Sequence, residues 1–192
     1  MIAPAVLLGL VMPYLAGVQG TCDPDTVNQI KAFWNGNPPQ HNLEKLNGFL
    51  THLTAPGYYT GSQEDIECFQ SNFNEDGSAF DVVITHNADT TVDVVYQATD
   101  NGDGTLTLTS PDFPSAETVY VIYFDNQVLA YFNCQDSENQ TYKGFAGIGV
   151  VNANNSDIEF SPTILKGLKE ADSALEQLKL ATLPGIDTSC GN

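Results

Sequence analysis

The stretch between residues 120 and 151 constrains the fold of this chain more than any other part of the sequence. Two runs of apolar, β-branched and aromatic residues, Val119–Phe124 and Val128–Cys134, are separated by only three polar residues. Such runs joined by a short polar loop predict a β-hairpin, and a third run, Phe145–Val151, extends it to a three-stranded meander. Almost no position in these runs is charged, so the strands should be buried on both faces or should close around an apolar cavity.

Shorter runs upstream predict further strands. An extended stretch begins at Gly48, and strands are expected at Ile66–Phe73, Ala79–Thr85, Thr91–Ala98 and Thr105–Thr109. Threonine alternates with leucine in the last of these, which is the period-two pattern of a strand with one apolar face. About eight consecutive strands with hairpin-length links predict a mostly β chain. The expected fold is an eight-stranded antiparallel up-and-down barrel, because closure removes exposed strand edges and leaves room for one small ligand.

A helix is expected on each side of the strands. Asp23-Pro24 is typical of a helix start, and Ile30 and Trp34 fall on one face of the helix that follows.

The C-terminal helix should begin at Ser161-Pro162 and end at Pro184-Gly185. Its apolar residues recur every three or four positions, the pattern of an amphipathic helix: Ile164, Leu168, Ala171, Leu175 and Leu178.

The first 20 residues carry no charged side chain and are mostly apolar. This run, ending in the compact residues Val18-Gln19-Gly20, predicts a secretory signal peptide over residues 1–20 rather than a membrane anchor. We therefore expect a secreted, extracellular protein with a single domain over residues 21–192. Two tripeptides, beginning at Asn139 and Asn154, match the acceptor pattern for N-glycosylation. Four cysteines remain, an even number that implies disulfides and allows three pairings.

Charge and motifs exclude several function classes. The formal net charge of −18 argues against a nucleic-acid partner, and no later segment predicts membrane insertion. Asp100–Gly104 looks like part of a calcium loop, but Thr99 and Ser110 occupy the first and last ligand positions, so a tight turn is expected. No CxxC spacing suggests zinc. The three histidines are scattered, so we expect no metal, no cofactor and no enzymatic activity.

Several short motifs, taken together and in order, resemble those of the lipocalin family. Within the family, the resemblance is greatest to apolipoprotein D and to the invertebrate pigment-binding and crustacyanin-like members. The resemblance covers roughly residues 42 to 190. The motifs are Asn42–Gly48, Glu67-Cys68, Tyr131–Cys134, Phe145-Ala146, Ser161-Pro162 and Gly185–Ser189. The resemblance implies disulfides between Cys22 and Cys134 and between Cys68 and Cys190.

The chain departs from the family at its signature. Leu50 stands where lipocalins have a tryptophan, and Val151 stands where they have the arginine that packs over it. Replacing both partners costs less than leaving either one alone, so the paired loss supports the alignment. Gly147 falls where apolipoprotein D-like members carry a pocket tryptophan. It either makes room for a ligand or allows a bend of the strand.

The resemblance implies that the function resides inside the barrel, which lipocalins use as a ligand-binding calyx. Besides Gly147, the residues expected to line it are Phe73, Ile84, Val94, Tyr96, Leu106, Leu108, Tyr120, Ile122, Phe132 and Phe145. The expected function is binding and transport of a small hydrophobic ligand such as a lipid, retinoid, carotenoid, bilin or odorant.

Two alternatives stay open. One is a binder of cationic biogenic amines, which would need Asp81, Asp93 or Glu117 inside the barrel. The other is a filled barrel that acts through its surface as an extracellular interaction or structural protein. The oligomeric state is also open, with a homo-oligomer among the options.

Overall fold

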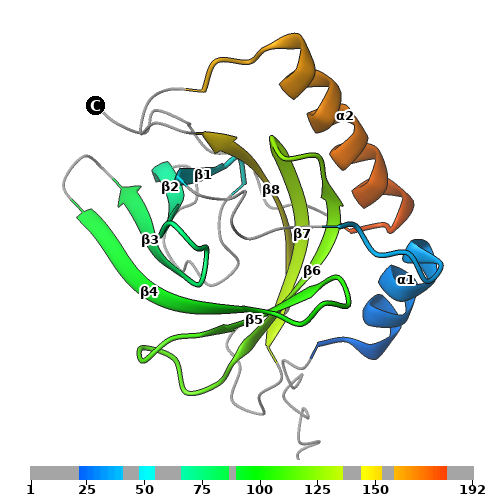
Figure 1. The fold of residues 1–192 in the computed structure, drawn as a ribbon, viewed down its shortest axis with the longest axis horizontal. Coiled ribbons are helices and arrows are strands. Elements are labelled where there is room, and N and C mark those ends of the chain that lie inside the picture. The colour runs from blue at the N-terminus through cyan, green and yellow to red at the C-terminus, as the bar shows by residue number, and fades with distance from the viewer. Residues whose placement is uncertain are drawn as a thin grey trace, which may run out of the picture.

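The structure is a computed structural model that describes residues 22–40, 48–54, 66–86, 90–135, 144–152 and 158–180. Within these ranges, eight antiparallel strands close into a barrel in sequence order, with β1 pairing to β8 (Figure 1). The strands are β1 (Gly48–His52), β2 (Ile66–Phe73), β3 (Ala79–His86), β4 (Thr90–Asp100), β5 (Thr105–Thr109), β6 (Glu117–Phe124), β7 (Val128–Gln135) and β8 (Phe145–Asn152). The predicted mostly β, up-and-down barrel is confirmed. The proposed signal peptide and the two glycosylation positions lie outside the described residues.

Helix α1 (Pro24–Trp34) begins where the sequence predicts. The Asp23 side chain accepts a hydrogen bond from the backbone N–H of Thr26 at 3.0 Å, which satisfies one of the free donors of the first turn. Asn35 ends the helix with a left-handed backbone conformation. At the other end of the chain, α2 (Pro162–Gln177) begins with the Ser161 hydroxyl accepting from the N–H of Ile164 at 3.3 Å.

Helix α2 ends earlier than predicted. The sequence placed its end at Pro184-Gly185, but Lys179 adopts a left-handed conformation with φ of 54° and stops the helix after Gln177. The N–H of Leu180 then bonds to the carbonyl of Leu175 at 3.0 Å, which satisfies a carbonyl of the last turn. Neither described helix is long and apolar enough to cross a membrane.

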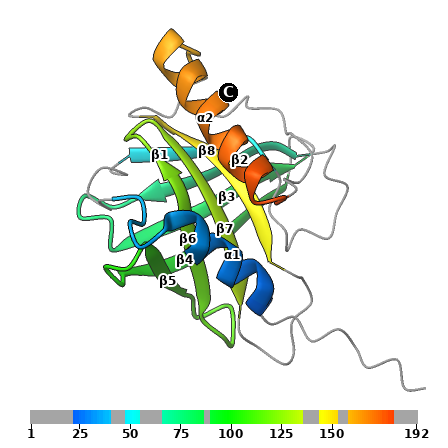
Figure 2. The same cartoon turned by 90° about the vertical axis from the view of Figure 1, so that its right-hand side faces the viewer.

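The barrel wall separates two apolar clusters. The inner core lies inside the barrel and consists of Leu50, Ile66, Phe69, Phe80, Val82, Ile84, Val94, Tyr96, Ala98, Leu106, Leu108, Val119, Val121, Leu129, Tyr131 and Phe145. The outer core lies between the outer face of β6–β8 and the helices, and consists of Cys22, Ile30, Trp34, Tyr120, Ile122, Val128, Ala130, Phe132, Cys134, Ala146, Ile148, Val150, Ile164, Ala171, Ala174, Leu175 and Leu178. Figure 2 shows both helices on this one side of the barrel. The meander is apolar at consecutive positions because both of its faces are covered.

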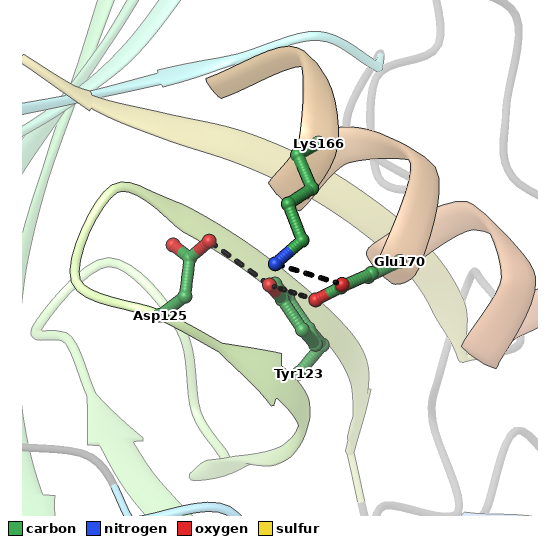
Figure 3. Close-up of polar contacts among 4 residues, drawn as sticks. All are labelled: Tyr123, Asp125, Lys166 and Glu170. Carbon is green, nitrogen blue, oxygen red and sulfur yellow. Dashed lines mark hydrogen bonds and ion pairs between the residues drawn. The ribbon is translucent and has the colours of Figure 1, made fainter. Parts of the chain in front are cut away.

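A polar cluster fixes α2 to the turn between β6 and β7 (Figure 3). The Tyr123 hydroxyl lies 2.9 Å from a carboxylate oxygen of Asp125 and 2.9 Å from one of Glu170 on α2. Lys166 forms an ion pair with Glu170 at 3.6 Å. Desolvation, followed by these two carboxylates, raises the pKa of the Tyr123 hydroxyl above its ordinary value. The hydroxyl therefore keeps its proton and donates it to either Asp125 or Glu170 at any one time.

One predicted disulfide is confirmed, and it attaches the start of α1 to the outer face of β7. The bond joins Cys22 and Cys134, whose Cα atoms lie 5.2 Å apart. Cys68 is also disulfide-bonded, and its expected partner, Cys190, lies outside the described residues.

Candidate ligand-binding cavity

The barrel contains a cavity of about 70 Å³. Its lining residues come from all eight described strands, and all of them project inward: Leu50, His52, Phe69, Ser71, Phe73, Phe80, Val82, Tyr96, Ala98, Leu106, Leu108, Glu117, Val119, Leu129, Tyr131, Asn133 and Phe145. Most of the wall is apolar, and six residues contribute a polar atom. An apolar cavity with a few convergent polar groups is the usual form of a small-molecule site.

Seven of the predicted calyx residues lie inside the barrel. Five of them line the cavity: Phe73, Tyr96, Leu106, Leu108 and Phe145. Ile84 and Val94 also belong to the inner core, but they do not border the cavity. Whether any of these residues binds a ligand stays a prediction.

Three predicted calyx residues lie on the other side of the wall. Tyr120, Ile122 and Phe132 belong to the outer core, so their assumed inward orientation is wrong. On β7 the inward residues are Leu129, Tyr131 and Asn133 instead. On β6 Glu117, Val119 and Val121 face inward, and a register shift between Val121 and Tyr123 then changes the alternation.

The glycine at position 147 makes room for a neighbouring side chain. Gly147 is the cross-strand partner of Tyr131, and a Cβ atom at this position would collide with the Tyr131 ring. Two other glycines serve in the same way, since a Cβ at Gly144 would collide with the ring of Phe132 and one at Gly149 with Leu50. The space left at Gly147 is therefore filled by protein.

At the family signature, Leu50 and Val151 are direct cross-strand partners of β1 and β8. Leu50 is buried in the inner core, and Val151 packs against that core. The two replacement residues therefore lie opposite each other on β1 and β8. This is the arrangement expected if both members of the tryptophan–arginine pair were replaced together.

One polar group inside the barrel is centred on His52. Its Nε2 lies 2.9 Å from the Ser71 hydroxyl, and its Nδ1 lies 2.9 Å from the Tyr131 hydroxyl. The imidazole stacks on Phe69 with ring centres 3.7 Å apart. Desolvation by burial lowers the pKa of His52 to about 3, so the imidazole is neutral at pH 7. A serine–histidine pair can form a nucleophile and its base, but so low a pKa makes His52 a weak base for that purpose.

The second polar group is centred on Glu117, the first residue of β6. Tyr96 donates a hydrogen bond to its Oε1 at 3.0 Å, and the side-chain amide of Asn133 donates to its Oε2 at 2.7 Å. Glu117 and Asn133 are 2% and 6% exposed. The other two carboxylates considered for an amine site are not placed there: Asp81 is exposed, and the side chain of Asp93 lies outside the described part of the chain.

Sequence reasoning missed most of the polar lining. His52 lay at a strand end, and Tyr131 and Asn133 were hidden in a run in which nearly every residue is apolar. A usable signal existed at Asn133, because an amide in the middle of an apolar strand needs a buried partner. Among the described residues, no group of three or more histidine, cysteine or acidic side chains could hold a metal ion.

No protein-family model and no curated protein sequence matches this chain. Its structure resembles solved structures of crustacyanin apoproteins. Lobster apocrustacyanin A1 is 14% identical, with a TM-score of 0.52 and 91% of each chain covered. Apocrustacyanin C2 is 16% identical, with a TM-score of 0.53 and the same coverage of both chains. At these identities the likeness establishes a shared fold. The closed barrel, the two helices on one side of it and these matches show that this chain has the lipocalin fold, which the resemblance in its sequence predicted.

Proposed function

We propose that this chain is a divergent, secreted lipocalin that binds and carries a small hydrophobic ligand inside its barrel. The observation that supports this function best is the cavity inside the barrel with its apolar wall. Removing apolar ligand surface from water contributes roughly 25 cal/mol per Å², and the apolar lining of the cavity can cover such a surface. The candidate ligands are a lipid, retinoid, carotenoid, bilin or odorant.

The size of the cavity restricts the ligand. At about 70 Å³, it is well below the roughly 300–1,000 Å³ of common ligand pockets. Three stacked or tilted aromatic rings border it, those of Phe73, Phe80 and Tyr96, and Phe113 continues the row beyond Tyr96, with neighbouring ring centres 4.7, 5.3 and 6.0 Å apart. Phe113 is half-buried on the loop between β5 and β6, so it can turn outward more easily than rings held on strands. A compact ligand fits with small adjustments, whereas a long one requires this row to move.

Secretion is part of the proposal. The uncharged run over residues 1–20 supports export. The Cys22–Cys134 disulfide fits an oxidising compartment. Glycosylation at Asn139 and Asn154 would follow from export. In this proposal the chain acts as a carrier and not as an enzyme.

An environment-sensitive apolar fluorescent probe tests the binding function. Trp34 is unsuitable as a reporter, because its indole N–H bonds to the carbonyl of Val121 at 3.0 Å from outside the barrel. Ala98 lines the cavity, so Ala98→Leu should fill part of it and reduce probe affinity by about tenfold or more, since each tenfold corresponds to about 1.4 kcal/mol. The matched control is Val95→Leu, on the same strand but 44% exposed on the outer face, which should leave affinity unchanged.

Native mass spectrometry of the protein from its own source would identify a bound ligand by its mass. Saturable probe binding that Ala98→Leu weakens and Val95→Leu leaves intact supports the carrier. No saturable binding by the folded wild-type protein would contradict it and would favour the filled barrel that acts through its surface.

A further inference from the structure

The inner face of the barrel carries a buried carboxylate with no cationic partner among the residues that line the cavity. Both oxygens of Glu117 accept a hydrogen bond, one from Tyr96 and one from Asn133, and both of these donors are neutral. The described lining contains no lysine or arginine, and its histidine, His52, is neutral. A buried charge is costly unless an opposite charge or several hydrogen bonds compensate it.

A second atom beside this carboxylate needs a donor. The Oδ1 of Asn133 is buried and has no hydrogen-bond partner among the described residues. The amide cannot be turned around to remove the problem, because its nitrogen must face Glu117 to donate at 2.7 Å. An unsatisfied buried acceptor costs roughly 1–3 kcal/mol. Asn133 borders the cavity, so a donor on a bound molecule can reach this side of the barrel.

The polar group centred on His52 does not need a ligand to complete its hydrogen bonds. Both ring nitrogens of His52 already have a partner, namely Ser71 and Tyr131. The demand for donors inside the barrel is therefore concentrated at Glu117 and Asn133.

Aromatic faces lie next to this acceptor pair. Tyr96, which donates to Glu117, stacks between Phe80 and Phe113 with ring centres 5.3 and 6.0 Å away. Aromatic faces attract cations, most strongly where water is excluded. The same surfaces also pack well against a flat apolar ligand.

We propose that the barrel selects a compact apolar molecule bearing one protonated amine, whose N–H groups donate to Asn133 Oδ1 and Glu117. This inference rests on the proposed function and specifies the head group of its ligand. The small cavity fits a body of about one ring better than a long chain. A ligand with a carboxylate head is disfavoured, because it would meet Glu117 and an orphaned carbonyl oxygen.

Three probes that share a phenylethyl body and differ in their end group separate the head groups: 2-phenylethylamine, n-propylbenzene and 3-phenylpropionate. Isothermal titration with the wild-type protein at pH 7 should give at least about tenfold tighter binding of the amine than of n-propylbenzene, the factor expected of a charge-assisted hydrogen bond in a dry site. The 3-phenylpropionate anion should bind most weakly of the three.

The variant Glu117→Gln keeps the shape of the side chain and removes its charge. It should weaken binding of the amine by about tenfold or more and leave n-propylbenzene within about twofold. The control is Glu75→Gln, the same change in the exposed turn between β2 and β3, which should alter neither. Retention of n-propylbenzene by Glu117→Gln shows that the variant is folded.

The outcomes distinguish the two proposals. If n-propylbenzene binds the wild type as tightly as the amine does, the amine inference fails and the carrier survives. Undiminished amine binding by Glu117→Gln also overturns the inference. If the folded wild type binds none of the three probes, the carrier and the amine inference fail together. If Glu117→Gln does not fold, the wild-type comparison of the three probes decides the inference without it.

Discussion

His52 illustrates how the barrel interior changes the chemistry of one residue. Its side chain is 4% exposed, lies against Phe69 and is surrounded by neutral hydrogen-bonding groups. Water would stabilise the protonated imidazole, and the barrel excludes that water. The pKa consequently falls from 6.5 to about 3. The residue is a neutral connector between β2 and β7.

This shift predicts that acid destabilises the protein through His52. Between pH 6.5 and about 3 the unfolded state binds a proton at His52 that the folded state does not. The contribution of His52 to the free energy of unfolding is therefore complete above pH 6.5 and decreases as the pH falls. The slope is about 1.4 kcal/mol per pH unit, and the total is on the order of 5 kcal/mol. His52→Gln should have a flatter acid profile than the wild type. Urea unfolding of both at pH 7 and pH 4.5 measures the difference.

Carboxylates contribute to both profiles in the same way, so the difference between the two proteins isolates His52. Parallel profiles would show that the imidazole becomes protonated within the folded barrel, against this prediction.

Helix α2 depends on a close approach to the turn between β6 and β7. Gly167 faces that turn, and a Cβ atom there would collide with Asp125 and with Val128. Asp125 cannot easily yield, because its Oδ1 accepts from the N–H groups of Gln127 and Val128 at 2.9 and 2.7 Å. Val128 is fully buried. The glycine thus permits the helix to lie against the barrel.

Gly167→Ala should therefore destabilise the protein, although alanine favours helix by about 1 kcal/mol over glycine. The displacement of α2 should cost roughly 1–3 kcal/mol, which leaves a net loss of up to about 2 kcal/mol. The control is Ser173→Ala, an exposed position on the same helix, where only the gain in helix propensity applies. Thermal unfolding of both variants checks this, and a more stable Gly167→Ala would refute the packing argument.

At the level of elements, the sequence predicted which strands exist better than it predicted which way they face. Inward residues were identified correctly on β4 and β5, where Val95 and Gln97 or the threonines alternate with apolar residues. On β6 and β7 the alternation is absent, since the helices cover the outer face and both sides are apolar. Tyr120 and Phe132 were assigned inward for that reason. Local sequence cannot decide the orientation there, because it is set by distant segments.

The end of α2 was missed for a related reason. Pro184-Gly185 is a strong stop signal, but the structure stops the helix at Lys179, a residue with no intrinsic preference for a left-handed conformation. The packing of Leu178 and Leu180 against the outer core accompanies this early turn.

For the whole molecule, the Cys22–Cys134 bridge connects the start of the described chain to the barrel across 112 residues. Limiting the unfolded chain in this way contributes on the order of 4–5 kcal/mol in the chain-entropy model. The double variant Cys22→Ala/Cys134→Ala should lose about this amount of stability in urea unfolding. Limited proteolysis should also cut near α1 faster than in the wild type.

Packing of Ile30 and Trp34 against the outer core offers a second attachment for α1. A loss below about 1 kcal/mol, far under the entropic expectation, with α1 still protected from proteolysis, would show that this packing suffices without the bridge.

Strand β7 is buried at all eight of its positions, since one face borders the cavity and the other carries the helices. Strand β4 behaves differently between Val94 and Ala98, where buried and exposed residues alternate. Substitutions at the exposed positions of β4 can therefore change the surface of the protein without altering its interior. Strand β7 has no exposed position, so any substitution there must be accommodated either by the cavity or by the helices.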